Sequence, residues 1–189
     1  MGKSSCGKDT IYRELMKREE LSLAALVPYT TRPIRKGERD GVVYHFTDED
    51  GYQELLKQGL VMEERGYQTM HGLWRYFTVR EEDFDLTKGS YLLIGTLETF
   101  CSLKDYLGED LVLPVYVETE DGQRLERALR RERKQAEPKY TEMCRRFLAD
   151  DEDFSDSKLE EAGVKRRFPN NGELTDCLEE IVCYLKEIV

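Results

Sequence analysis

The sequence lacks the long apolar runs and the leader segment that would mark a membrane or exported protein. No apolar stretch in its 189 residues approaches the roughly 20 residues that a membrane-spanning helix needs. No signal peptide opens the chain, so we expect a cytoplasmic protein without membrane partners. The length allows one sizeable core, with room for a small inserted subdomain.

Cysteine is also scarce, and its spacing excludes the sites that cysteines usually build. The five cysteines are an odd number, and none of them are spaced C-x-x-C. This usage argues against a disulfide framework and a cysteine-rich metal site. It suits a reducing compartment.

Positive charge is outweighed, since 29 Lys and Arg residues face 39 Asp and Glu residues for a net charge of −10. That balance argues against a general nucleic-acid binder. The basic residues nevertheless gather in three islands: Arg32, Arg35, Lys36 and Arg39; Arg124, Arg127, Arg130, Arg131, Arg133 and Lys134; and Arg145 with Arg146. Such clusters suit the binding of a small polyanion, although solvated helix faces are the alternative.

Residues 2–10 read G-K-S-S-C-G-K-D-T, which contains the G-x-x-x-x-G-K pattern of a phosphate-binding loop. The two glycines let the backbone curl so that its N–H groups point inward, and a side chain at Gly7 would crowd the phosphate. Residues 11–17 have helical spacing, so the loop should lead into a helix N-terminus that favours anions. The alternative is a flexible Gly/Ser-rich tail.

The predicted ATP-binding residues form one continuous set: Gly2, Lys3, Ser4, Ser5, Cys6, Gly7, Lys8, Asp9 and Thr10. Lys8 would place its ammonium over the β- and γ-phosphates. Asp9 stands where Ser or Thr is usual, but a carboxylate is a good ligand for Mg²⁺, so Asp9 and Thr10 are the predicted metal ligands. Only Met1 precedes the loop, so the β-strand that normally anchors it is either missing or replaced by another segment.

Apolar segments alternate with helical ones along the rest of the chain. Residues 21–27, 90–96 and 111–117 predict buried strands, the last weakened by Pro114. Helices are predicted at 97–107, from Thr119 through Arg133, from Pro138 onward, and at the C-terminal stripe of Leu174, Leu178, Ile181, Leu185 and Ile188. Residues 150–153, all acidic, predict an exposed turn. This alternation predicts an α/β fold with a P-loop NTPase-type parallel sheet flanked by helices.

Residues 32–89 predict a small β-rich subdomain inserted into that core. We expect a strand at 42–46, then a helix that begins at a capping box of Thr47 and Asp50 and ends at Gly59. Short strands are predicted at 60–64, 67–70 and 74–79, with turns at Gly66 and Gly72. The chain would be a single domain, residues 1–189, with its core formed by 1–31 and 90–189.

Residues 30–46 carry a second motif, T-T-R-x-x-R-x-G-E-x-x-G-x-x-Y-x-F. In residue type and spacing it resembles the nucleoside-monophosphate signature of the guanylate kinase family, and it follows the phosphate loop at a short distance. The resemblance extends over essentially the whole chain. It implies a P-loop nucleoside monophosphate kinase in which residues 32–89 bind the monophosphate and residues of about 124–146 form a helical arginine lid.

The resemblance implies the reaction ATP + GMP ⇌ ADP + GDP with Mg²⁺, and it assigns the acceptor phosphate to four side chains. Arg32 and Arg35 would grip the phosphate, since arginine binds phosphate bidentately. Tyr44 and Tyr76 would donate two further hydrogen bonds. The partners implied are the small molecules ATP and GMP, and no protein partner is predicted.

The resemblance also places guanine recognition on the strands after residue 60. Glu63 would accept hydrogen bonds from N1–H and the exocyclic amine, and Thr78 would act on the O6 side. The alternative for Glu63 is an exposed strand carboxylate, and Glu64 next to it leaves the register open by one residue.

The lid arginines implied by the resemblance are Arg130, Arg131, Arg133, Arg145 and Arg146. Positioned cations and Mg²⁺ carry most of the catalysis of in-line phosphoryl transfer. The predicted catalytic residues are therefore Lys8, Arg35, Arg130, Arg133, Arg145 and Arg146.

Some positions depart from the family pattern, mostly on the base and metal sides. Pro28 stands where a serine would contact guanine, and Ile94 and Thr96 stand where the family has acidic residues. His71 and Trp74 either line the base pocket or simply pack. Two alternatives follow: a kinase for another small phosphorylated acceptor, and a non-catalytic binding module, against which the intact phosphate loop counts.

Overall fold

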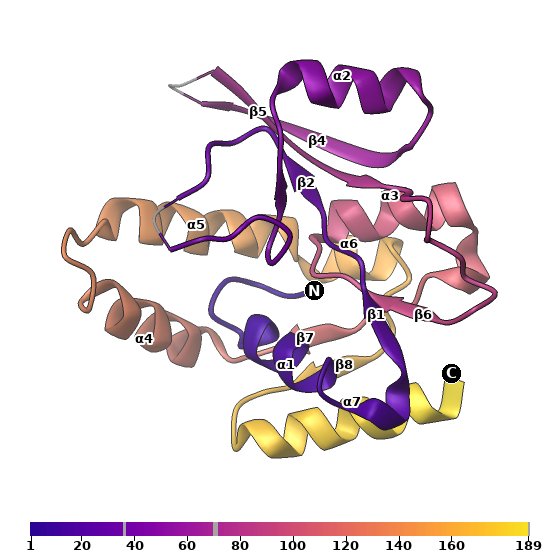
Figure 1. Ribbon diagram of the computed structural model, residues 1–189. Coiled ribbons are helices and arrows are strands. Elements are labelled where there is room, and N and C mark those ends of the chain that lie inside the picture. Colours follow the sequence, from indigo (N-terminus) through magenta and orange to yellow (C-terminus); the bar gives the residue numbers. More distant parts are fainter. Residues whose placement is uncertain (36, 70–71, 189) are drawn as a thin grey trace. The chain divides into compact units, whose positions relative to one another are not determined.

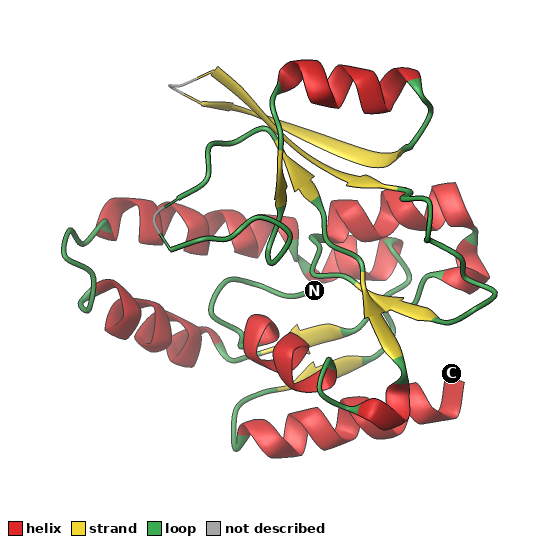
Figure 2. Cartoon of the chain, viewed as in Figure 1, coloured by secondary structure: helices red, strands yellow, loops and turns green. Residues whose placement is uncertain are grey.

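The computed structural model of the protein describes residues 1–35, 37–69 and 72–188. Helices and strands alternate through this part of the chain, which confirms the α/β class (Figure 1 and Figure 2). The chain divides into two compact units. The first consists of Met1–Leu21, Ile94–Leu97 and Leu113–Val189, and the second of Ser22–Leu93 and Glu98–Val112. Among the described residues, no helix is both long and apolar enough to cross a membrane.

The first unit is built on a short parallel pair of strands. Its elements are α1 (Lys8–Leu15), the 3-10 helix η1 (Glu19–Leu21), β7 (Tyr116–Glu118), α4 (Asp121–Glu132), α5 (Tyr140–Asp153), α6 (Asp156–Glu161), β8 (Arg167–Pro169) and α7 (Leu174–Ile188). β7 and β8 run parallel, with Tyr116 opposite Arg167. Buried side chains of α1 and α7, among them Ile11 and Ile181, form much of the core.

Met1 makes strand-like contacts with β7. Its backbone nitrogen donates to the oxygen of Val115 at 2.8 Å, and its own oxygen accepts from the nitrogen of Val117 at 3.0 Å. This alternation is the pattern of a parallel ladder. Met1 therefore lies beside β7 at the place from which the phosphate loop departs.

The second unit contains a four-stranded sheet and a separate parallel pair. Its elements are β1 (Leu23–Ala25), β2 (Tyr29–Thr30), β3 (His45–Phe46), α2 (Glu49–Lys57), β4 (Val61–Thr69), β5 (Gly72–Val79), β6 (Ser90–Leu92), all of α3 (Leu97–Leu107) but its first residue, and the 3-10 helix η2 (Glu109–Leu111). The sheet order is β3-β2-β5-β4, and β1 pairs with β6. Tyr52 of α2 packs with Phe77 and Val79 of β5 in the core of this unit.

The long hairpin of β4 and β5 corrects the prediction of three short strands. β4 continues from Val61 to Thr69 through Gly66, which pairs with Arg75 instead of forming a turn. Glycine, which has no side chain, weakens a strand but does not end it when the neighbouring residues remain paired. The predicted end of the middle strand, Met70, lies outside the described residues.

The N-caps of two predicted helices each lie one residue later than expected. Asp48 caps α2 by accepting a hydrogen bond from the nitrogen of Gly51 at 2.8 Å, so the capping box of Thr47 and Asp50 is not formed. Glu120 caps α4. Thr119 does not, because its hydroxyl donates to the oxygen of Cys6 at 3.0 Å.

Several predicted strands are shorter than expected. The strand predicted at 42–46 is reduced to His45–Phe46, and the one predicted at 111–117 begins only at Tyr116, two residues after Pro114. Proline removes a ladder donor, which explains the late start. The apolar stripe predicted for the C-terminal helix is confirmed at Leu178 and Ile181, which are buried, whereas Ile188 is exposed.

Candidate functional site

The phosphate loop of the first unit is shaped by the residues behind it. Gly7 has φ +98° and caps the start of α1. A Cβ there would lie 2.4 Å from Nδ2 of Asn170, which donates to the oxygen of Cys6 at 2.7 Å. Gly7 therefore makes room for a buried amide. That its missing side chain also makes room for a phosphate stays a prediction.

Position 2 requires glycine because the backbone there lies close to β7 and to Cys6. A Cβ at Gly2 would lie 2.4 Å from the oxygen of Val117 in β7 and 2.9 Å from Sγ of the buried Cys6. No real Cβ fits at such distances, and the φ of +148° also favours glycine. The loop is thus packed directly on the strand behind it.

The last three of the predicted ATP-binding residues, which include both predicted metal ligands, lie at the start of α1. Nζ of Lys8 is 3.5 Å from the oxygen of Lys3, so the side chain spans the loop. Asp9 is exposed, and the Thr10 hydroxyl accepts from Arg13 at 3.4 Å. Among the described residues, no group of three or more His, Cys, Asp or Glu side chains forms a ready metal site. An exposed carboxylate beside a hydroxyl nevertheless fits the oxygen ligands that Mg²⁺ prefers.

The acidic residues near the end of α5 bind the phosphate loop. They are part of the helix, which corrects the prediction of an exposed turn at 150–153. Oδ2 of Asp150 accepts from the nitrogen of Ser4 at 2.7 Å, and Oδ1 of Asp151 accepts from Nζ of Lys3 at 2.7 Å. The bond from Lys3 holds the pKa of Asp151 below its ordinary value.

Arg124 of α4 connects these carboxylates to the loop and has 0% exposure. Its Nε donates to the oxygen of Ser4 at 3.2 Å and its Nη2 to Asp150 at 3.2 Å. Asp121 and Asp151 accept from its Nη1. The sequence showed Arg124 only as one member of a basic island, and nothing in the local pattern distinguished it from the other members.

The predicted lid arginines lie on α4 and α5, whose residues are in contact (Figure 1). Arg130 and Arg145 form ion pairs on their own helices, at 2.6 Å with Glu126 and at 2.8 Å with Glu142 respectively. Arg146 lies 3.8 Å from the same Glu142. Arg133 is the C-cap of α4 and is exposed.

Arg131, which the resemblance placed in the lid but which we did not predict to be catalytic, reaches the phosphate loop. Its Nη2 donates to Oγ of Ser5 at 3.3 Å. The catalytic roles predicted for the other lid arginines stay predictions.

The monophosphate signature folds around one buried arginine in the second unit. Arg32 forms two hydrogen bonds with the carboxylate of Glu38, both at 2.8 Å. Glu38 also accepts from the backbone nitrogen of Arg35 at 2.7 Å, while the Arg35 side chain is exposed. The hydrogen bond from Arg32 holds the pKa of Glu38 below its ordinary value. Glu38 therefore closes the loop and orients Arg32.

Aromatic rings surround the guanidinium of Arg32. It lies 5.3 Å from the ring centres of both Tyr44 and Phe46. Tyr44 in turn meets Tyr76 with ring centres 5.6 Å apart. The structure thus brings Arg32, Tyr44 and Tyr76 together, whereas the side chain of Arg35 points into solvent.

A β-bulge directs Glu63 into the protein. The register between β4 and β5 shifts between Val61 and Glu63, so the consecutive residues Met62 and Glu63 are both buried. A bulge re-aims side chains in this way. Glu63 is 5% exposed, so its interpretation as an exposed strand carboxylate is wrong. Glu64 lies on the opposite face, 3.6 Å from Arg75.

Glu63 is held by two donors. The Thr78 hydroxyl donates to Oε1 at 2.6 Å, and Nε of Arg65 donates to Oε2 at 3.2 Å. The structure therefore brings the two predicted base-reading residues into contact. Arg65 was missed, and the available signal was its position two residues after Glu63, on the same face of a strand.

The remaining departures from the family pattern have ordinary structural roles or lie elsewhere. The Pro28 oxygen accepts from the nitrogen of His45 at 2.9 Å. Trp74 pairs across the hairpin with Tyr67 and is half-buried. His71 lies outside the described residues. Ile94 and Thr96 belong to a short segment of the first unit.

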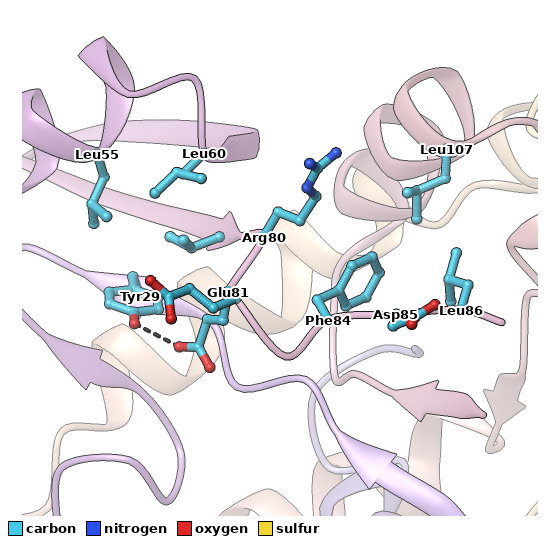
Figure 3. A pocket seen from close by; sticks show the side chains of 11 residues that line it. Tyr29, Leu55, Leu60, Arg80, Glu81, Phe84, Asp85, Leu86 and Leu107 are labelled. Atoms are coloured by element: carbon cyan, nitrogen blue, oxygen red, sulfur yellow. Dashed lines mark hydrogen bonds between the residues drawn. The ribbon is translucent and has the colours of Figure 1, made fainter. Parts of the chain in front are cut away.

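The second unit also has a cavity of about 710 Å³ that none of the predicted site residues lines. Leu55, Leu60 and Tyr29 lie on one side of it, and Phe84 and Leu107 on the other (Figure 3). The Tyr29 hydroxyl donates to Glu81 at 2.6 Å (Figure 3). Carboxylates stand beside the apolar side chains, so the lining does not select one class of ligand.

Comparison with curated proteins gives short but consistent matches. The guanylate kinase of Alkalilimnicola ehrlichii is 43% identical over 60 residues, which are 32% of this chain and 29% of that protein. The guanylate kinase of Streptococcus mutans is 39% identical over 66 residues, 35% of this chain and 31% of that protein. The matched segment spans about a third of the length of these relatives.

Two comparisons extend over more of the chain. The crystal structure of guanylate kinase from Anaplasma phagocytophilum aligns with 98% of this chain and 82% of its own, with a TM-score of 0.64 and 19% identity. At that identity it shows the fold alone. The guanylate kinase family model matches residues 1–150. Because this match covers well over half of the sequence, the chain belongs to the guanylate kinase family.

Proposed function

We propose that the protein transfers the γ-phosphoryl group of ATP to GMP. The observation that carries this proposal is the buried contact of Glu63 with Thr78 on the same hairpin as Tyr76, which meets Tyr44 beside Arg32. A carboxylate for the base and a cation with two hydroxyls for the phosphate are the two halves of a nucleotide site.

Charge supports the assignment of the phosphate end of the proposed site. A monophosphate is an anion, and Arg32 is a cation whose fork is already pre-oriented by Glu38. The hydroxyls of Tyr44 and Tyr76 supply hydrogen bonds, and the exposed Arg35 can join when the phosphate is present. These four residues all lie within residues 32–89, the proposed monophosphate-binding subdomain.

The hydrogen-bonding pattern of guanine supports the assignment of the base end. Guanine offers two adjacent donors, N1–H and the 2-amine, and a carboxylate accepts both. Adenine presents an acceptor at N1, so the Glu63 carboxylate would face a lone pair and leave a buried charge without its partner. The Thr78 hydroxyl is the proposed contact on the O6 side.

The ATP half is supported by the first unit. We propose that residues 2–10 bind the ATP phosphates through their backbone amides, with Lys8 as the mobile cation. Asp9 and Thr10 would hold Mg²⁺, which neutralises phosphate charge in this chemistry. Arginines within 124–146 form the proposed lid, and no general base is needed because the acceptor phosphate is already an anion.

We propose a cytoplasmic location. The cysteines are free, including the exposed Cys144 and Cys183, and exposed free thiols suit a reducing compartment.

An acceptor panel tests this function. ATP would be supplied with GMP, dGMP, AMP, UMP, CMP and sugar phosphates in turn, and ADP formation measured. We expect GMP to give the highest kcat/KM and Lys8→Met to abolish transfer while GMP binding persists. If another acceptor outranked GMP, the kinase would be one for that acceptor. GMP binding without any turnover would identify a non-catalytic module.

A further inference from the structure

We propose that Arg65 is a positioning residue that sets guanine specificity by fixing the carboxylate of Glu63. The inference rests on the proposed function, because it assumes that Glu63 reads the base. It adds a residue that neither motif contains, since the phosphate loop ends at Thr10 and the monophosphate signature at Phe46.

The placement of Arg65 follows from the pairing of β4 and β5. Glu63 lies opposite Thr78, and Arg65 lies opposite Tyr76. Side chains two residues apart share a face of a strand, so these four residues form one group on the hairpin. Arg65 is thereby next to both the base-reading pair and a tyrosine of the phosphate cluster.

The contacts of Glu63 fix the plane of its carboxylate. One oxygen accepts from the Thr78 hydroxyl at 2.6 Å, and the other accepts from Nε of Arg65 at 3.2 Å. A carboxylate held at both oxygens cannot rotate freely, yet each oxygen has a second lone pair. These two remaining acceptor positions match two adjacent donors of a base, N1–H and the 2-amine of guanine.

Arg65 also compensates the negative charge of Glu63. The Glu63 side chain has 0% exposure and that of Arg65 has 10%. A buried carboxylate without a counter-charge is costly. Arg65 supplies the compensating charge from inside the protein, before any ligand arrives.

A comparison of GMP with IMP as substrates measures the role of Arg65. GMP and IMP both offer N1–H, but only GMP has the 2-amine. A fixed carboxylate uses both donors of GMP and only one of IMP. When the carboxylate is free to turn, the second contact weakens, so the preference for GMP over IMP should shrink without any change at the ATP loop.

The test compares kcat/KM for GMP and IMP in Arg65→Met, Arg65→Lys and the unaltered protein. We expect Arg65→Met to raise KM for GMP and to reduce the GMP-to-IMP ratio by roughly tenfold, while KM for ATP stays the same. Arg65→Lys keeps the charge and should recover part of the ratio. Arg75→Met is the matched control: its side chain pairs with Glu49 on the other face of the hairpin, so the ratio should not change.

The outcomes separate this inference from the proposed function. If the unaltered protein neither binds nor phosphorylates GMP, the proposed function is wrong. If it phosphorylates GMP and Arg65→Met leaves the GMP-to-IMP ratio intact, the role of Arg65 is wrong. Should Arg65→Met fail to fold, Arg65→Gln, which is smaller and uncharged but polar, takes its place with the same expected loss of ratio.

Discussion

Asp150 accepts a hydrogen bond from the backbone amide of Ser4, with 2.7 Å between the nitrogen and Oδ2. The carboxylate lies near the C-terminal end of α5, and the amide lies in the phosphate loop. Arg124 bonds to both residues, through the Ser4 oxygen and the Asp150 carboxylate. A fully buried guanidinium thus ties the loop to two helices of the first unit.

Arg124→Met should destabilise the protein and weaken ATP binding. Removing one partner of a buried ionic cluster leaves uncompensated charge and costs about 3–5 kcal/mol. Asp150 and Asp151 would then stand beside the loop without their counter-charge and repel the ATP phosphates, which should raise KM for ATP by roughly tenfold. Denaturant unfolding and steady-state kinetics measure the two effects.

The control for Arg124 is Arg130→Met on the same helix. Arg130 is 71% exposed and pairs with an exposed glutamate, so the free energy of unfolding should change by less than about 1 kcal/mol. Equal losses of stability in the two variants would contradict the clamp described for Arg124.

Arg131 and Arg130 should differ in catalysis as well. Arg131 reaches Ser5 in the phosphate loop, whereas Arg130 pairs with Glu126. If Arg131 stabilises the transferring phosphoryl group, Arg131→Met should lower kcat by roughly 10³-fold or more, and Arg130→Met should lower it less than tenfold. A larger loss in Arg130→Met than in Arg131→Met would support the catalytic role predicted for Arg130 and contradict one for Arg131.

Gly7→Ala should lower stability for two separable reasons. The left-handed backbone costs an alanine about 1–2 kcal/mol, and its Cβ would lie 2.4 Å from Nδ2 of Asn170. Adding Asn170→Ala should recover the part due to the clash and leave the backbone strain. Unfolding of both single variants and the double variant measures the interaction, and full additivity would show that Asn170 is not the obstacle.

The stabilising effect of the pair between Arg32 and Glu38 should be lost in acid. Arg32 holds the pKa of Glu38 below its ordinary value, which is about 4.3 in an unfolded chain. The folded state therefore gains stability from this group above that value and loses it as the pH falls through the lowered folded pKa. Glu38→Gln should be less stable than the unaltered protein at neutral pH, with the difference disappearing in acid. A difference that is constant with pH would contradict this linkage.

The sequence predicted those parts of the site that depend on neighbours along the chain. The loop that turns at Gly2 and Gly7 and the helix after it were predicted. Arg32 and Tyr44, two residues of one signature, lie together. Element boundaries were less accurate. Thr119, for example, has the residue type of a helix cap, but its hydroxyl is used by Cys6, a contact that sequence spacing does not reveal.

The parts that could not be predicted depend on contacts between distant residues. Ser4 and Asp150 are 146 positions apart, so the acidic end of α5 read as an exposed turn. The inward direction of Glu63 depends on a bulge in β4, which shifts the alternation that sequence reading assumes. Because the sequence does not reveal the bulge, it did not determine whether Glu63 or Glu64 faces inward.

The pair of neighbouring glutamates provides the most direct test of the site. Glu63 is buried against Thr78, and Glu64 lies on the other face of β4 beside Arg75. If Glu63 reads guanine, Glu63→Gln should lower kcat/KM for GMP by roughly 10²- to 10³-fold, while Glu64→Gln stays within a few-fold of the unaltered protein. Equal losses in the two variants, or a larger loss in Glu64→Gln, would contradict the proposed guanine site.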